Sequence, residues 1–204
     1  NLFKEINNGS KGKISSIHFQ ENEDEVQYYL SGDGKCRQRL DDFGVNTPFH
    51  IPYKKRPVEF LLEQMKAQSK LMFVHNVATN SEDIQKILTS EKTAYWCLCP
   101  NANAFIQNRL PRIELFNRVE DFVTIGTDSF ASNNNLSILD EIQTLLNQNN
   151  IEIEKLLKFA TLNGARFLGI EDRFGSFEKG KQPGIIAINP INREVSTSNI
   201  TRII

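Results

Sequence analysis

Four polar side chains draw attention because each follows an apolar run of the chain. His18 and Glu21 lie in the segment IHFQE, and His75 closes the run LMFVH. Asp128 ends the run VTIGTD. Neutral imidazoles and carboxylates bind divalent transition metals, and both kinds of group move protons in catalysis. These residue types therefore indicate a metal-assisted reaction, provided that the fold brings them together.

Each of these residues also has an ordinary structural explanation. An acid such as Glu21 suits the first turn of a helix, and His75 could be a hydrogen-bonded core residue. Asp128, which precedes SFASNNN, could be a turn or N-cap residue. His50 lies in TPFHIPY between two prolines and is interpreted as a loop residue. What favours chemistry is that His18, His75 and Asp128 each end a different predicted strand.

The elements that must position these residues alternate along the chain. We predict strands at 14–20, 71–75, 93–99 and 123–128, and helices at 21–32, 57–68, 81–90, 137–148 and 152–168, with Ser81 as a cap and a short helix near 35–44. We interpret 100–116 as loop and 31–56 as a mostly irregular connection. Each strand is a continuous apolar run, which is typical of a parallel sheet covered by helices. Active sites of such folds lie at the carboxyl ends of the strands.

Bulk composition excludes several classes of protein. The chain has 204 residues, 39% of them hydrophobic and 24% charged, and a net charge of −1. These values are typical of a globular protein, and the scattered basic residues argue against a nucleic-acid partner. No apolar run approaches the roughly 20 residues that span a bilayer, and the N-terminal segment does not resemble a signal peptide. Cys97 and Cys99 are interpreted as buried strand thiols. We expect a cytoplasmic protein that binds no membrane.

Four separated motifs together resemble the amidohydrolase superfamily, in its branch of guanine deaminase, adenosylhomocysteine deaminase and chlorohydrolases. The motifs are IHFQENEDE, LMFVHN, CPNANAFIQNRLP and IGTDSFASNNNLSILDEI. The resemblance implies an α/β fold. Residues 1–174 would form the second half of a TIM (β/α)8 barrel, strands five to eight, and residues 175–204, with short strands and glycine turns, would be the C-terminal segment of a small β-sandwich domain.

The resemblance also implies a role for each site residue. His18 and Asp128 would bind one divalent metal ion, zinc or, as the alternative, iron. Asp128 would also accept a proton from the metal-bound water. Glu21 would carry a proton to the ring nitrogen and leaving group of the substrate, and His75 would orient the hydroxide or stabilise charge. Asn103 matches a position that contacts substrate or supports a ligand.

The implied reaction is hydrolysis of a C–N bond other than a peptide bond, namely deamination of a small amino-substituted heterocycle by a metal-bound hydroxide. Dechlorination is the alternative within the enzyme class. Two departures matter: the sequence contains no H-x-H, which supplies two further ligands in the family, and Ala102 stands where serine is common. The first four barrel strands also have no counterpart. A half barrel exposes strand edges, so we expect a homo-oligomer. Because the two H-x-H ligands are absent, we expect weak metal binding. The alternative function is a catalytically silent structural or self-associating module.

Overall fold

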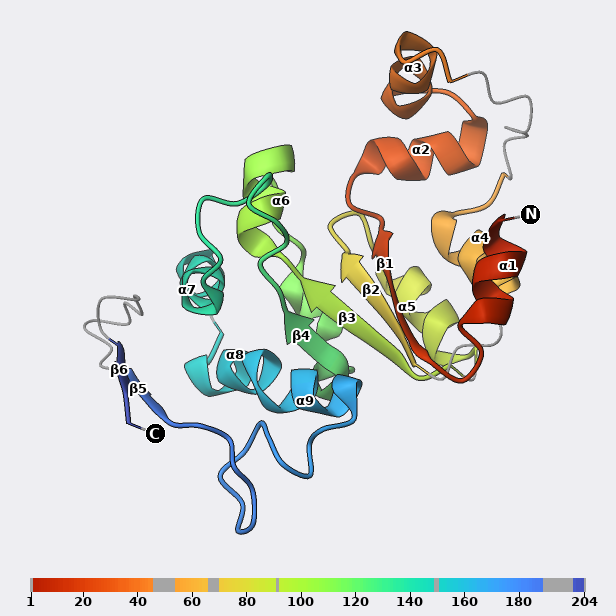
Figure 1. Cartoon of the computed structure of the whole chain (residues 1–204). Coiled ribbons are helices and arrows are strands. Elements are labelled where there is room, and N and C mark those ends of the chain that lie inside the picture. Colours follow the sequence, from red (N-terminus) through yellow and green to blue (C-terminus); the bar gives the residue numbers. More distant parts are fainter. Residues whose placement is uncertain are drawn as a thin grey trace. The chain divides into compact units, whose positions relative to one another are not determined.

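The computed structural model describes residues 2–45, 54–65, 70–90, 92–148, 151–188 and 200–203. The chain divides into two compact units, residues 1–94 and 95–204. Figure 1 labels their helices and strands. His50 lies outside the described residues. Among the helices that are described, none combines the length and apolar character needed to cross a bilayer.

Unit 1 contains a pair of parallel strands with helices after each strand. Its elements are α1 (Leu2–Gly9), β1 (Ile14–Phe19), α2 (Glu23–Ser31), α3 (Lys35–Asp42), α4 (Pro57–Gln64), β2 (Lys70–His75) and α5 (Ser81–Leu88). His18 lies opposite Val74 and Phe19 lies opposite His75 in the register of β1 and β2. The carboxyl ends of both strands therefore meet at one edge, and that edge carries both histidines.

Local sequence explains where these helices begin and end. The Asn22 side chain accepts a hydrogen bond from the Glu25 N–H at the start of α2, and Gly32 ends the helix at φ 76°. A left-handed residue at this position is typical of glycine. In α5 the cap is Asn80, whose side chain accepts from the Asp83 N–H. The prediction that Ser81 caps this helix is wrong by one residue, because Ser81 is already its first helical residue.

Unit 2 also contains a pair of parallel strands, followed by three helices and a short hairpin-like pair. Its elements are β3 (Ala94–Leu98), whose first residue closes unit 1, α6 (Pro100–Gln107), η1 (Ile113–Phe116), η2 (Glu120–Phe122), β4 (Val123–Ile125), α7 (Ile138–Gln148), α8 (Ile153–Ala160), α9 (Leu162–Leu168), β5 (Ile186–Ile188) and β6 (Ile200–Arg202). β3 and β4 are parallel, whereas β5 and β6 are antiparallel. Short strands in the C-terminal segment are confirmed.

Three sequence predictions need correction in unit 2. Residues 100–116, predicted as loop, form α6 and η1, because Pro100 occupies the first turn of α6 and its inner face is buried. The predicted single helix at 152–168 breaks at Thr161, whose φ of −128° and ψ of −84° are not helical. The predicted strand at 123–128 ends at Ile125, and Asp128 has a left-handed φ of 56°.

The strands differ in how fully they are buried. Every residue of β3 and β4 is buried, as the continuous apolar runs predicted. In β1, by contrast, His18 and alternate residues before it are exposed. The strand β1 is therefore less covered than the prediction of a parallel sheet covered by helices implied. Cys97 and Cys99 are free thiols, 9% and 1% exposed, which confirms that both are buried. Cys97 lies in β3 as predicted, whereas Cys99 follows the strand as the N-cap of α6.

Candidate functional site

The two strand-end histidines of unit 1 lie together. The rings of His18 and His75 meet edge to face, with centroids 4.8 Å apart and an interplanar angle of 89°. A possible ligand nitrogen of each ring lies within 4.8 Å of one on the other. His75 is fully buried, whereas His18 is exposed. The sequence prediction that separate strands bring these two imidazoles to one edge is confirmed for this pair.

The backbone next to these histidines adopts unusual conformations. Gln20, His75 and Asn76 have left-handed φ values of 46°, 80° and 62°. Non-glycine residues rarely adopt this region, and strained backbone gathers at functional sites. Hydrogen bonds hold the two strand ends together, because the Asn76 N–H donates to the Phe19 carbonyl at 3.1 Å and the Thr79 hydroxyl donates to Gln20 Oε1 at 2.8 Å. The conformation of both histidine-bearing segments is therefore fixed from within unit 1.

Glu21, the predicted proton carrier, is held by a second glutamate. The carboxylate of Glu25 accepts the N–H of Gln20 at 3.1 Å and that of Glu21 at 3.0 Å. Burial raises the pKa of Glu25, and these two backbone hydrogen bonds act against that rise. The side chain of Glu21 is half-buried. Sequence reasoning missed Glu25, although its position three residues after the cap Asn22 is a recognisable capping pattern.

In unit 2 the surroundings of Asp128 are polar and ordered. The Ser132 hydroxyl donates a short hydrogen bond to Asp128 Oδ2, and Asp128 itself is half-buried. Asn133 Nδ2 donates to the Thr127 carbonyl at 2.8 Å. Ser132 thus holds the Asp128 carboxylate, and Asn133 holds the backbone one residue before it. Sequence reasoning singled out Asp128 but not the Ser132 and Asn133 contacts that fix it.

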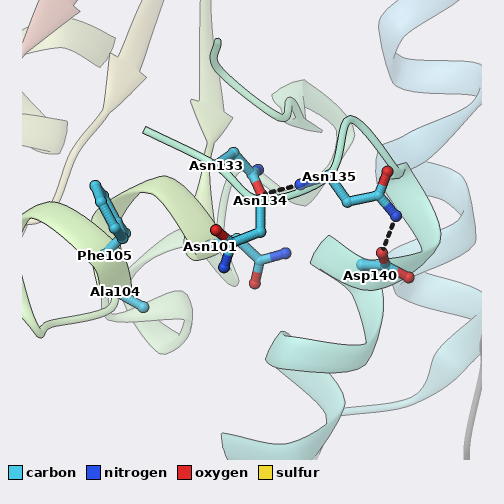
Figure 2. A pocket seen from close by; sticks show the side chains of 7 residues that line it. All are labelled: Asn101, Ala104, Phe105, Asn133, Asn134, Asn135 and Asp140. Carbon is cyan, nitrogen blue, oxygen red and sulfur yellow. Dashed lines mark hydrogen bonds between the residues drawn. The ribbon is translucent and has the colours of Figure 1, made fainter. Parts of the chain in front are cut away.

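A small pocket opens beside this loop. Figure 2 shows the residues that line it. The pocket has a volume of about 370 Å³ and is lined by Asn101, Ala104, Phe105, Asn133, Asn134, Asn135 and Asp140. Asn103, predicted as a substrate or supporting contact, is fully buried and is not among them. Its neighbour Asn101 faces the pocket instead.

Comparison with known proteins adds to this geometry. A sequence profile described as the amidohydrolase family matches residues 10–203. The chain belongs to the amidohydrolase family. This amidohydrolase chain is 30% identical over 183 residues to a 5-methylthioadenosine/S-adenosylhomocysteine deaminase of Teredinibacter turnerae. The matched residues cover 85% of the chain and 36% of the relative. It is 26% identical over 173 residues to an adenosine deaminase of Helicobacter pylori, covering 83% of the chain and 41% of the relative.

Solved structures show a similar fold. Aminofutalosine deaminase of Helicobacter pylori, in complex with methylthio-coformycin, matches at 22% identity with a TM-score of 0.72, over 90% of this chain and 44% of that one. An adenosine deaminase of Xanthomonas campestris with bound zinc matches at 25% identity with a TM-score of 0.63, over 86% and 37%. The amidohydrolase chain therefore spans less than half the length of these relatives.

Proposed function

We propose that this amidohydrolase takes part in metal-dependent hydrolytic deamination of an amino-substituted heterocycle. The observation that carries the proposal is the pair of imidazoles, His18 and His75, at the carboxyl ends of adjacent parallel strands. Active sites of parallel α/β folds are built at such strand ends. The names of the curated relatives, which are deaminases of adenosine-type nucleosides, favour deamination over dechlorination and favour a purine nucleoside as the substrate class.

The donor set of the chain fits a divalent transition metal. An imidazole and a carboxylate are donors that zinc and iron accept, and the Xanthomonas campestris relative holds zinc. We propose that His18 and Asp128 bind the ion. When bound, the ion supplies Lewis acidity, which lowers the pKa of a water ligand to about 7.

The other residues would then handle protons and charge. Asp128 would accept a proton from the attacking water, and Glu21 would deliver a proton to the ring nitrogen and to the departing amine. His75, buried beside His18, would stabilise the negative charge that develops on the reacting oxygen. Asn103 would support this arrangement from the buried side of α6. These roles match the residue types, since carboxylates exchange protons and a buried imidazole offers a directed N–H.

The proposal includes an architecture. β1 to β4 would correspond to strands five to eight of a (β/α)8 barrel, and residues 175–204 to part of a small β domain. Free thiols at Cys36, Cys97 and Cys99 favour a reducing compartment such as the cytoplasm. Self-association of the chain is part of the same proposal, and sedimentation velocity would measure it.

Ammonia release from the zinc-loaded chain tests the reaction. Adenosine, methylthioadenosine, S-adenosylhomocysteine and guanine would be assayed, with chloride release from a chlorotriazine alongside. We expect ammonia from at least one purine compound, and a loss of about 10²- to 10⁴-fold in kcat for Glu21→Gln. Glu154→Gln is the matched control, because Glu154 is exposed on α8. If the chain binds zinc but releases only chloride, dechlorination replaces deamination. If it binds no zinc and releases no ammonia, the catalytically silent module is correct for this chain.

A further inference from the structure

A fully buried carboxylate in unit 2 has no role in the proposed chemistry. Glu141 lies on α7 with none of its surface exposed. Its Oε2 accepts the Asn101 N–H at 2.8 Å, and its Oε1 accepts from Asn133 Nδ2 at 2.6 Å. Burying a carboxylate costs free energy unless strong donors satisfy it. The burial of Glu141 is therefore explained by its hydrogen bonds to Asn101 and Asn133.

The two donors belong to the two segments that follow the strands of unit 2. Asn101 stands in the first turn of α6, directly after β3, and Asn133 stands in the loop that carries Asp128. One turn farther along α7, the Thr144 hydroxyl donates to Asn101 Oδ1. Figure 2 shows Asn101 on its helix facing the loop of Asn133 and Asn135. Glu141 and Thr144 of α7 thus hydrogen-bond to these segments within one helical turn.

The orientation of the Asn133 amide is fixed on every side. Its Nδ2 donates to Glu141 and also to the Thr127 carbonyl at 2.8 Å, while its Oδ1 accepts the Asn135 N–H at 3.2 Å. Turning the amide over would break all three bonds. The carboxylate is therefore connected through Asn133 to the residue immediately before Asp128, without touching Asp128 itself.

We propose that Glu141 is a positioning residue for the Asp128 loop and for the first turn of α6. The inference rests on the proposed function in that Asp128 is taken as a metal ligand. Groups that support a ligand from behind commonly set metal affinity, by about 10- to 100-fold. Glu141 would act by fixing the Thr127 carbonyl and hence the left-handed backbone conformation of Asp128.

Hydrogen–deuterium exchange of the full chain tests the positioning role without metal. Glutamine at position 141 offers one acceptor, so one of the two donors would face another N–H. We expect amide exchange in 126–135 and 100–104 to accelerate about tenfold in Glu141→Gln, with the rest of the chain unchanged. Glu154→Gln makes the same change at an exposed site and should leave both segments at wild-type rates. Unchanged exchange in 126–135, or acceleration spread evenly over the chain, would overturn the proposal.

A second variant separates the two branches of the network. Asn133→Ala removes the bridge to Thr127 but leaves the Glu141–Asn101 bond, so only 126–135 should exchange faster. Equal acceleration of 100–104 would contradict the proposed connectivity. Zinc titration of the same samples should show affinity reduced about tenfold in Glu141→Gln. A wild-type chain that binds no zinc would refute the proposed function, while the exchange data would still decide the role of Glu141.

Discussion

Asp83 is a fully buried carboxylate on α5, and Arg56 supplies its charge partner. Arg56 Nε donates to Asp83 Oδ1 at 2.7 Å and Nη2 donates to Oδ2 at 2.6 Å. Nη2 also donates to the Ala78 carbonyl at 3.1 Å, in the segment after His75. This forked geometry is specific to arginine. Arg56, which directly precedes α4, is thus linked both to α5 through Asp83 and to the segment after His75 through Ala78.

Replacing Arg56 should be costly because it leaves a buried charge unpaired. We expect Arg56→Ala to lower the free energy of unfolding by about 3 kcal/mol in urea denaturation. Lys55→Ala is the adjacent control, since Lys55 pairs with Glu63 while both side chains are exposed. Such a pair contributes less than about 1 kcal/mol. Equal losses in the two variants would show that the Asp83 carboxylate is satisfied by other donors.

Glu25 should make stability depend on pH. Burial raises its pKa above the ordinary value of 4.5, so the folded chain holds this proton more tightly than the unfolded chain. The resulting stabilisation is complete below about pH 4.5 and is lost as pH rises through the folded pKa. Glu25→Gln cannot titrate. The unfolding free energy of wild type relative to this variant should therefore fall as pH rises above 4.5.

Denaturant titrations at a series of pH values measure this difference. Glu5→Gln, the same change at an exposed position of α1, should follow the wild-type pH profile. A constant difference between wild type and Glu25→Gln from pH 4 to pH 8 would contradict the expected proton linkage.

At the scale of elements, the sequence predicts what local patterns determine. β2 lies within one residue of its predicted range, and α4 begins at Pro57 as predicted but ends at Gln64. An uninterrupted apolar run and a proline in the first helical turn act locally. α6 was missed because its asparagines have low helix propensity, and burial of Ala102 and Asn103 outweighs that preference.

In the candidate site, too, local sequence patterns predict some residues and not others. His18 and His75 could be predicted because their strand-end positions are visible in the sequence. Glu141 could not, because its donor Asn101 lies 40 residues away. Its one sequence signal is an acid beside Leu139 and Ile142 on the buried side of α7. Contacts between distant segments, rather than local pattern, determine this part of the network.

The contact of β4 with β3 depends on a glycine. A Cβ at Gly126 would lie 2.8 Å from Cys97 Sγ and 3.6 Å from Cys99 Sγ. Both sulfurs are buried, so they have little room to move. We expect Gly126→Ala to lower the free energy of unfolding by about 1–3 kcal/mol through overpacking. Adding Cys97→Ala should restore part of this loss, because it removes the nearest atom.

Gly164→Ala is the control for this experiment. Gly164 lies within α9, and nothing lies within 4 Å of an added Cβ. Alanine there should stabilise the chain by about 0.5–1 kcal/mol, because glycine is a poor helix former. Denaturant titration measures Gly126→Ala, Cys97→Ala, their double variant and Gly164→Ala. Strictly additive effects of Gly126→Ala and Cys97→Ala would show that the thiol is not the obstacle.

At the scale of the whole molecule, zinc binding by the proposed ligands His18 and Asp128 should be measurable as a change in the stability of the chain. A ligand that binds the folded chain and not the unfolded chain stabilises it by mass action. Zinc at 100 times its Kd should add about 2.7 kcal/mol, a rise in Tm of roughly 5 to 10 °C for a chain of this length. EDTA should remove the increase, and added zinc should restore it.

Substitutions and other ions decide whether this stabilisation comes from the proposed site. His18→Ala should abolish the zinc-dependent rise in Tm, whereas His50→Ala, at the histidine interpreted as a loop residue, should retain it. Magnesium prefers oxygen ligands and should not replace zinc at a site containing imidazole. Differential scanning calorimetry measures each case. An undiminished zinc effect in His18→Ala would place the ion elsewhere, and the strand-end histidines would then be structural residues of unit 1.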